Sequence, residues 1–266
     1  MNIQESIQKR RSVRTYTGQS LKREHITALK QFISQLPPFH NIKARIEHLS
    51  VFSGEKPIKL GTYGKISGAK DFIVLIYENI PFAEAAAAYQ FEQVILFCTE
   101  LGLATCWLGA AFNSNDFKKH VQLNKNETLK IVSPVGYPAE KQRFLERLVR
   151  VDKIHNSRKP FGELFFYQNF DTPLTEETAG IYFIPLSMVR LAPSGHNKQE
   201  WRIIKNDNVF HFYKNPCSPF DNIDIGIALC HFIETCKEIN VQIKLEFLTD
   251  YPISNNLQYM VSCIVG

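Results

Sequence analysis

A cluster of basic side chains around one serine lies close to the start of this 266-residue chain. The segment KRRSVR at residues 9–14 contains Arg10, Arg11 and Arg14, with the hydroxyl of Ser12 among them. Guanidinium groups are planar forks of N–H donors that match the oxygens of a phosphate monoester. The segment therefore predicts a phosphate site, with a solvated basic helix end as the alternative.

A second polar segment, MVRLAPSGHNKQEWRII at residues 188–204, follows an apolar helical pattern and leads into a strand pattern. Pro193 ends the helix, and Ser194 and Gly195 are expected to expose backbone N–H groups with little side-chain bulk. Asn197 and the polar residues after it add donors and acceptors. This composition favours a polyhydroxylated small molecule with a ring as the ligand.

The two segments together carry a resemblance to a known family. APSGHNKQEWR resembles the APSxxNxQPWRF signature of the flavin-dependent nitroreductases, and KRRSVRTY resembles that family's opening phosphate-binding motif. In the common enzymes the two signatures lie a few dozen residues apart, whereas here most of the chain separates Ser12 from Pro193. This arrangement resembles the TM nitroreductase branch, in which one polypeptide mimics the two-subunit dimer. The resemblance implies FMN as the cofactor and one composite site per chain.

Carried over residue by residue, the resemblance implies that Arg10 and Ser12 hold the phosphate and ribityl chain of FMN. Arg14 would reach the pyrimidine edge of the ring, where a cation stabilises the charge of the reduced flavin. Arg158, in SRKP, matches the family's second phosphate arginine. Asn156 departs from the pattern, because that position is often lysine in the family, and the phosphate site has one cation fewer.

The resemblance also implies cofactor contacts made by backbone groups. Residues 108–110 match the TCWxGG element, whose backbone N–H lies at the flavin N5, although Gly109 could instead only end a helix or open a turn. Lys65, in the glycine-rich loop LGTYGKISGAK, is a further candidate for the pyrimidine edge. The remaining cofactor candidates implied by the resemblance are Leu108, Gly109, Ala110, Pro193, Ser194, Gly195 and Asn197.

The function implied by the resemblance is that of an FMN-dependent oxidoreductase. NAD(P)H would deliver electrons to the flavin, and a small acceptor such as a nitroaromatic or a quinone would take them. No catalytic side chain and no metal is predicted, since the flavin carries the chemistry. The alternative is a flavin-binding carrier or sensor without turnover, in which Phe39 or Phe112 fills the place of the acceptor.

The pattern of the chain predicts the helices and strands of an α+β protein, and the resemblance implies a nitroreductase-like fold. It consists of two pseudo-repeats, about residues 1–166 and 167–266 of a single domain, each with a mainly antiparallel sheet around paired central helices. The alternative is a chance match between common α/β elements. The predicted helices start near Ser20 and span residues 83–103 and 224–239, and the predicted strands span residues 46–52, 72–77, 130–138, 201–204, 209–213, 243–248 and 259–265.

The bulk composition limits the possible partners. A net charge of +5, spread along the chain, gives little support to nucleic-acid or membrane binding. The six cysteines show no zinc spacing, and we expect reduced, mostly buried thiols in a cytoplasmic protein. We expect a monomer, because the two long apolar helices can pair within one chain. Gln199 is expected to brace the loop after Pro193, and Trp201 to be structural.

Overall fold

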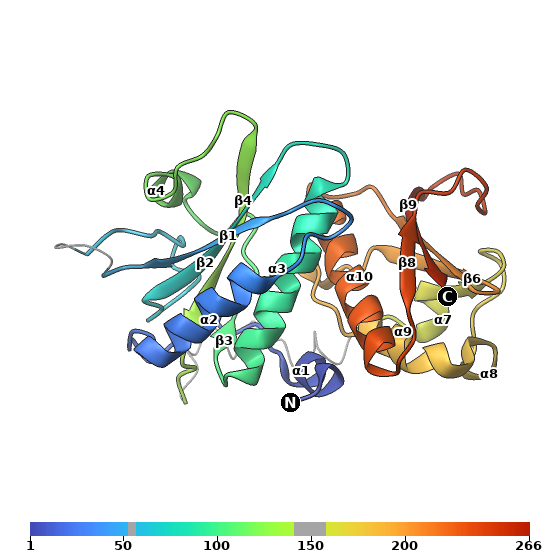
Figure 1. Cartoon of the computed structure of the whole chain (residues 1–266), viewed down its shortest axis with the longest axis horizontal. Coiled ribbons are helices and arrows are strands. Elements are labelled where there is room, and N and C mark those ends of the chain that lie inside the picture. The colour runs from blue at the N-terminus through green and yellow to red at the C-terminus, as the bar shows by residue number, and fades with distance from the viewer. Residues whose placement is uncertain (53–56, 141–157) are drawn as a thin grey trace. The chain divides into compact units, whose positions relative to one another are not determined.

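The computed structural model describes residues 1–52, 57–140 and 158–266 (Figure 1). The chain divides into two compact units. Unit 1 contains Met1 and Lys9–Val151, and unit 2 contains Asn2–Gln8 and Asp152–Gly266. The chain therefore passes from unit 2 to unit 1 between Gln8 and Lys9.

Unit 1 is a four-stranded antiparallel sheet with the strand order β1-β2-β4-β3. Its elements are α2 (Arg23–Gln35), β1 (Arg45–Ser50), β2 (Asp71–Glu78), α3 (Ala83–Glu100), β3 (Ala104–Thr105), α4 (Ser114–Lys118) and β4 (Glu127–Gly136).

The central strand β2 of unit 1 is buried along almost its whole length. On one face, Phe72, Val74 and Ile76 belong to an apolar cluster that includes Leu108 and Phe117. The helix α3 packs against β2 and runs along the sheet in Figure 1. A strand with a side-chain period of two needs apolar residues at every position when both faces are covered, which explains the continuous run FIVLIY.

The helix α3 is apolar around most of its circumference, and its first turns are buried alanines. Small side chains allow close approach of neighbouring elements, and alanine also has the highest helix propensity. The helix ends before Gly102, whose φ of +72° suits a residue without a Cβ atom. Phe97 near this end stacks on Phe32 of α2, with ring centroids 4.1 Å apart.

Unit 2 contains a five-stranded sheet with the order β5-β6-β7-β9-β8, antiparallel except for the parallel pair β5 and β6. Its elements are α7 (Phe161–Leu164), β5 (Phe165–Tyr167), α8 (Glu176–Ala179), η1 (Gly180–Tyr182), α9 (Phe183–Arg190), η2 (Gly195–Asn197), β6 (Trp201–Asn206), β7 (Val209–Lys214), α10 (Asp221–Glu238), β8 (Ile243–Glu246) and β9 (Gln258–Val265).

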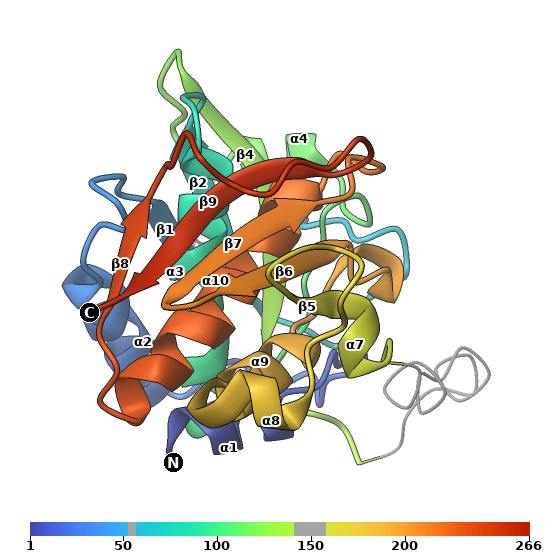
Figure 2. The same cartoon turned by 90° about the vertical axis from the view of Figure 1, so that its right-hand side faces the viewer.

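The helix α10 covers one face of this sheet, as Figure 2 shows. Phe210 and Phe212 of β7 both pack against Phe232 of α10, at centroid distances of 4.8 and 5.6 Å. The N-terminal helix α1 (Ile3–Lys9) is held at the end of α10, where Glu238 accepts hydrogen bonds from the backbone N–H of Ile3 and the side chain of Gln4, each at 2.8 Å. Most of α1 thus belongs to unit 2.

The two sheets share one topology. The order β1-β2-β4-β3 of unit 1 is repeated as β6-β7-β9-β8 in unit 2, and in both sheets the second strand in the chain order has a register irregularity against the fourth. In each unit, a helix precedes the first strand and a long helix follows the second. The predicted α+β class is confirmed.

The predicted strands and long helices are observed with small shifts at their ends. The sequence did not indicate β3, which has two residues, or β5, which pairs in parallel with β6. The helix α9 ends at Arg190, before Pro193. Asn156 and most of the charged stretch after Ala139 lie outside the described residues.

Two further features follow from the described parts of the chain. None of the helices there has the length and apolar character needed to cross a membrane. All six cysteines are free thiols, and only Cys217 is exposed.

Candidate functional site

The RRSVR segment lies beside β3 in unit 1. Ser12 forms a parallel bridge with Thr105, and the N–H of Val13 donates to the carbonyl of Thr105 at 2.9 Å. Because residues 106–110 follow Thr105 directly, this bridge places two of the sequence-predicted segments next to each other.

Arg10 is almost completely buried, with 3% of its surface exposed. Burial lowers the pKa of its guanidinium, and the nearby carboxylate of Glu92 partly offsets that effect. Its Nε and Nη1 atoms have no hydrogen-bond partner within the described part of the chain. A buried donor without an acceptor costs about 1–3 kcal/mol. Phosphate oxygens are acceptors that would remove this cost, so Arg10 fits an anionic ligand.

Glu92 is a buried acidic residue that the sequence did not single out. It lies on α3 with none of its surface exposed, and it accepts a hydrogen bond of 2.8 Å from the indole Nε1 of Trp107. It also acts electrostatically on Arg10. Glu92 therefore links the basic segment to the segment that contains Gly109.

Arg14 and Lys65 belong to neighbouring segments of unit 1. The carbonyl of Arg14 accepts the N–H of Ser67 at 2.9 Å, and the N–H of Tyr16 donates to the carbonyl of Ser67 at 2.8 Å. The backbones of these two segments lie close together, because a Cβ atom on Gly68 would lie 2.3 Å from the carbonyl oxygen of Tyr16. The glycine-rich loop thus runs beside the basic segment, with the side chain of Lys65 exposed.

Residues 108–110 begin with a residue paired to β4 and continue in a bend. Leu108 is buried and exchanges two backbone hydrogen bonds with Val132, at 2.9 and 3.1 Å. Gly109 and Ala110 follow in a bend, with Gly109 half-buried and Ala110 exposed. Their backbone is therefore anchored on one side by Leu108.

Arg11 is exposed, and its Nη1 donates to the carbonyl of Arg10 at 2.9 Å. Unit 1 thus contains the following cofactor candidates: Arg10, Arg11, Ser12, Arg14, Lys65, Leu108, Gly109 and Ala110.

Arg158 lies in unit 2 at the C-terminal end of α9. Its Nη1 donates to the carbonyl of Ala192 at 2.7 Å and its Nη2 to the carbonyl of Leu191 at 3.0 Å. The last carbonyls of a helix lack partners within the helix and carry partial negative charge, so an arginine there is stabilising. The resemblance assigns Arg158 to phosphate, but two of its N–H donors hold the backbone that leads into the 193–197 loop.

The loop after α9 is held by its own polar groups. The N–H of Gln199 donates to Ser194 Oγ at 3.0 Å, and Gln199 Nε2 donates to the carbonyl of Asn197 at 3.0 Å. Gln199 Oε1 accepts the N–H of Lys159 at 2.9 Å. The prediction that Gln199 braces this loop is confirmed. Trp201, which follows, is completely buried, as expected of a structural residue.

The backbone N–H of Gly195 was predicted to be exposed for a ligand, and this is wrong. It donates to both carboxyl oxygens of Asp224, each at 3.1 Å. Asp224 lies in the first turn of α10 and is 4% exposed. Burial raises the pKa of Asp224 to about 8, with Asp221 and Glu200 acting in the same direction and the Gly195 N–H opposing them.

Asp224 is a functional candidate that sequence reasoning missed. Its signal was an acidic residue between Ile223 and Ile225, directly before a long apolar stretch of the same helix. Pro193, Ser194 and the other candidates of this segment lie in the same unit as Arg158. No group of three or more potential metal ligands occurs among the residues that the structure describes.

Residues 2–236 match the model of a protein family described as "Putative TM nitroreductase". The chain belongs to this family. The resemblance predicted from the two sequence motifs is therefore confirmed, and membership in this nitroreductase family indicates an oxidoreductase.

One solved structure shows the same nitroreductase fold. A "putative nitroreductase" from Thermotoga maritima is 20% identical, with a TM-score of 0.63, and the match covers 100% of this chain and 94% of that chain. A nitroreductase with bound FMN from Bacteroides fragilis is 16% identical, with a TM-score of 0.42, and the match covers 54% of this chain and 92% of that chain. A comparison with curated proteins found no match.

Proposed function

We propose that this TM nitroreductase family member binds FMN and transfers electrons from NAD(P)H to a small acceptor such as a nitroaromatic or a quinone. The observation that carries the proposal is the position of Arg10. Its buried Nε and Nη1 donors have no partner in the described part of the chain, and Ser12, two residues later, lies against the strand that leads to Gly109. The FMN bound to a solved nitroreductase from Bacteroides fragilis supports the choice of cofactor.

The residues of unit 1 suit the parts of FMN. Arg10 and Arg11 would hold the phosphate, and Arg14 and Lys65 would supply positive charge for the pyrimidine edge. The backbone at Gly109 has room for close approach, since glycine has no side chain. Bound FMN would supply the hydride chemistry, so the protein is left to orient the ring, donate hydrogen bonds and exclude water.

The candidates of unit 2 are assigned through the family motif. Pro193, Ser194 and Asn197 remain proposed contacts of the ring and ribityl chain. Arg158 has two donors on backbone carbonyls, and we therefore assign it a supporting role at the 193–197 loop.

Substitution of Arg10 tests the cofactor assignment. Arg10→Gln should weaken FMN by about 100-fold, because a charge-assisted bond to phosphate contributes about 1.5–3 kcal/mol, and should leave riboflavin almost unchanged. Arg23→Gln, an exposed arginine of the same unit, serves as the control. Fluorescence titration of both ligands provides the measurement. Equal losses for FMN and riboflavin would show that Arg10 does not bind phosphate.

A flavin-binding protein without turnover is the second candidate. It is supported by Phe39, whose ring stacks on Tyr89 at a centroid distance of 3.7 Å and so places an aromatic ring in the loop before β1. Phe112 is buried and packs on Phe117, so it belongs to the core of unit 1. Anaerobic addition of NADH or NADPH separates the two functions. Bleaching followed by reoxidation with a quinone supports the enzyme, and a flavin that stays yellow supports the carrier.

We also propose that the chain binds one FMN and acts as a monomer. The repeated strand order within one chain supports this proposal, because it supplies two copies of the same topology without a second subunit. The RRSVR segment occurs once, in unit 1. Calorimetric stoichiometry and sedimentation at falling protein concentration test it. Two FMN per chain, or an FMN affinity that falls as a dimer dissociates, would contradict it.

A further inference from the structure

The carboxyl group of Asp224 joins the long helix of unit 2 to the 193–197 loop. Both of its oxygens lie 3.1 Å from the backbone nitrogen of Gly195. In the described part of the chain, this N–H is the donor that reaches Asp224, and the side chain is 4% exposed. A carboxylate has about four acceptor positions, so a single N–H satisfies the ionised form poorly.

The surroundings of Asp224 add negative charge. Asp221 precedes it by one turn on α10, Glu200 lies directly before β6, and both raise the pKa of Asp224. The Oδ2 atom of Asp221 accepts the N–H groups of Cys217 and Ser218, each at 2.8 Å. Burial is the largest cause of the raised pKa, which lies at about 8. Near neutral pH the closed loop therefore holds Asp224 in its protonated form.

We propose that Asp224 is the positioning residue of the 193–197 loop, that its protonated form keeps the loop closed, and that loss of its proton is coupled to loop opening. When the loop opens, water reaches the carboxyl group and removes the cost of burying the charge. The proton leaves to solvent in the same step.

Linkage gives the size of the effect. An Asp exposed to water has a pKa of about 4, whereas in the closed loop the value is about 8. Between these values the open form has released a proton that the closed form keeps. The population of the open loop then rises by up to about tenfold per pH unit and levels off above the pKa of the closed form.

The consequence for the cofactor rests on the proposed function. The 193–197 loop contains proposed contacts of the flavin ring, so FMN affinity should fall as the pH rises from 6 to 8. Asp224→Asn cannot ionise, and its side-chain oxygen can still accept the Gly195 N–H. The variant should bind FMN with little dependence on pH over the same range.

Hydrogen exchange of the ligand-free, full-length protein tests the proposal directly. The amides of peptides that contain Gly195 should lose protection by up to about tenfold per pH unit between pH 6 and 8, after correction for the intrinsic exchange rate. Asp224→Asn should abolish this dependence. Asp221→Asn, a matched change on the same helix, should keep it but shift the plateau to lower pH, because one neighbouring negative charge is removed. Asp224→Ala should lower protection at every pH.

Two outcomes would overturn the proposal. One is protection at Gly195 that does not change with pH in the wild-type protein, and the other is the same pH dependence in Asp224→Asn. Failure of the proposed function gives a different result: no FMN binds, while the pH dependence of exchange at Gly195 and its loss in Asp224→Asn are still observed.

Discussion

Unit 1 and unit 2 each contain a loop that joins a helix to the first strand of the shared topology, and the two loops have related backbones. The pair His40 and Asn41 has φ values of 48° and 62°, and the pair His196 and Asn197 has φ values of 52° and 57°. Residues other than glycine are uncommon at positive φ, so two His-Asn pairs in this conformation are a specific similarity. The loops differ in the side chain that holds them.

In unit 1 the loop is held by Gln90, a neutral amide on α3. Its Oε1 accepts the N–H of Ala44 at 3.1 Å, and its Nε2 donates to the carbonyls of Ile42 and Ala86, each at 3.0 Å. In unit 2 the long helix α10 provides Asp224, an ionisable group with one N–H donor from the loop. The comparison teaches that the long helix of the same topology can hold this loop with a neutral side chain at every pH, or with an ionisable one whose hold depends on its protonation.

Gln90→Leu should give the largest loss of stability. Gln90 is 1% exposed, and its loss leaves the buried N–H of Ala44 and the carbonyl of Ile42 without their partner. We expect a loss of about 2–4 kcal/mol in the free energy of unfolding, equal at pH 6 and pH 8. Urea unfolding measures it, with the exposed Gln35→Leu as the control. A loss that depends on pH would contradict a neutral brace.

Asp224→Asn should stabilise the protein at alkaline pH. The folded pKa of Asp224, about 8, lies above the unfolded value of about 4, so the folded state keeps a proton that the unfolded state has lost. Wild-type stability therefore falls as the pH rises through this window. The gain of the variant should be near zero at pH 4, about 2–3 kcal/mol at pH 6 and about 5 kcal/mol at pH 8, since each pH unit between the two pKa values contributes about 1.4 kcal/mol. Denaturation curves at several pH values measure it, and a constant gain would argue against ionisation as its cause.

Arg158→Gln should distinguish the two arginines that the resemblance assigns to phosphate. Arg158 donates to the carbonyls of Leu191 and Ala192, so its loss should cost about 1–2 kcal/mol of stability and weaken FMN and riboflavin alike. Arg10→Gln should weaken the binding of FMN and leave the binding of riboflavin almost unchanged. Parallel titrations of both variants provide the measurement. If Arg158→Gln lowers the affinity for FMN but not for riboflavin, Arg158 binds the phosphate.

The sequence predicted the elements whose pattern is local. The buried strand from Phe72 to Tyr77 and the alanine-rich helix after Ala83 have long apolar runs, and a local pattern of this kind determines an element directly. The strand β3 has two residues, and its pairing with β4 depends on contacts distant in the chain.

Candidate site residues could be proposed from the sequence where a motif existed. The basic segment and the loop after Pro193 were found through their motifs. Asp224 was missed, because its partner, the N–H of Gly195, is a backbone group 29 residues away. Arg158 shows the opposite limit. The motif gives its position, whereas its contacts with two helix carbonyls depend on where α9 ends.

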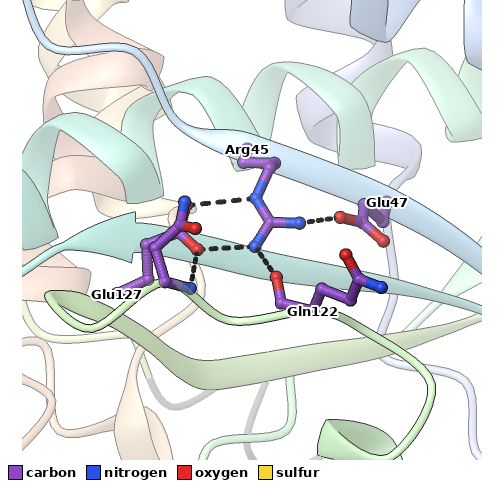
Figure 3. A network of polar contacts seen from close by, with 5 residues as sticks. Arg45, Glu47, Gln122 and Glu127 are labelled. Carbon is purple, nitrogen blue, oxygen red and sulfur yellow. Dashed lines mark hydrogen bonds and ion pairs between the residues drawn. The ribbon is translucent and has the colours of Figure 1, made fainter.

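The smallest predicted effect concerns an arginine near the start of β1 in unit 1 and of β6 in unit 2. Arg45 of β1 forms an ion pair with Glu127, with Nη2 and Oε2 2.6 Å apart, and also contacts Glu47 (Figure 3). This pairing raises the pKa of Arg45. Arg202 of β6 donates instead to the carbonyls of Gln199 and Trp201, and burial lowers its pKa. One strand start therefore depends on a carboxylate and the other on backbone groups.

Glu127→Gln should sharpen this difference. The hydrogen bond from Arg45 is the largest cause of the lowered pKa of Glu127, so the carboxylate stabilises the folded state above the unfolded value of about 4. That contribution is lost as the pH falls through the folded pKa. We expect Glu127→Gln to cost about 1 kcal/mol at pH 7 and little at pH 3, measured by denaturation at both values. Arg202→Gln, as the comparison, should depend less on pH, since its hydrogen-bond acceptors are carbonyls and the carboxylates of Glu200 and Glu163 act on it only through their charge. An equal cost of Glu127→Gln at pH 3 and pH 7 would show that the charge of Glu127 does not hold the start of β1.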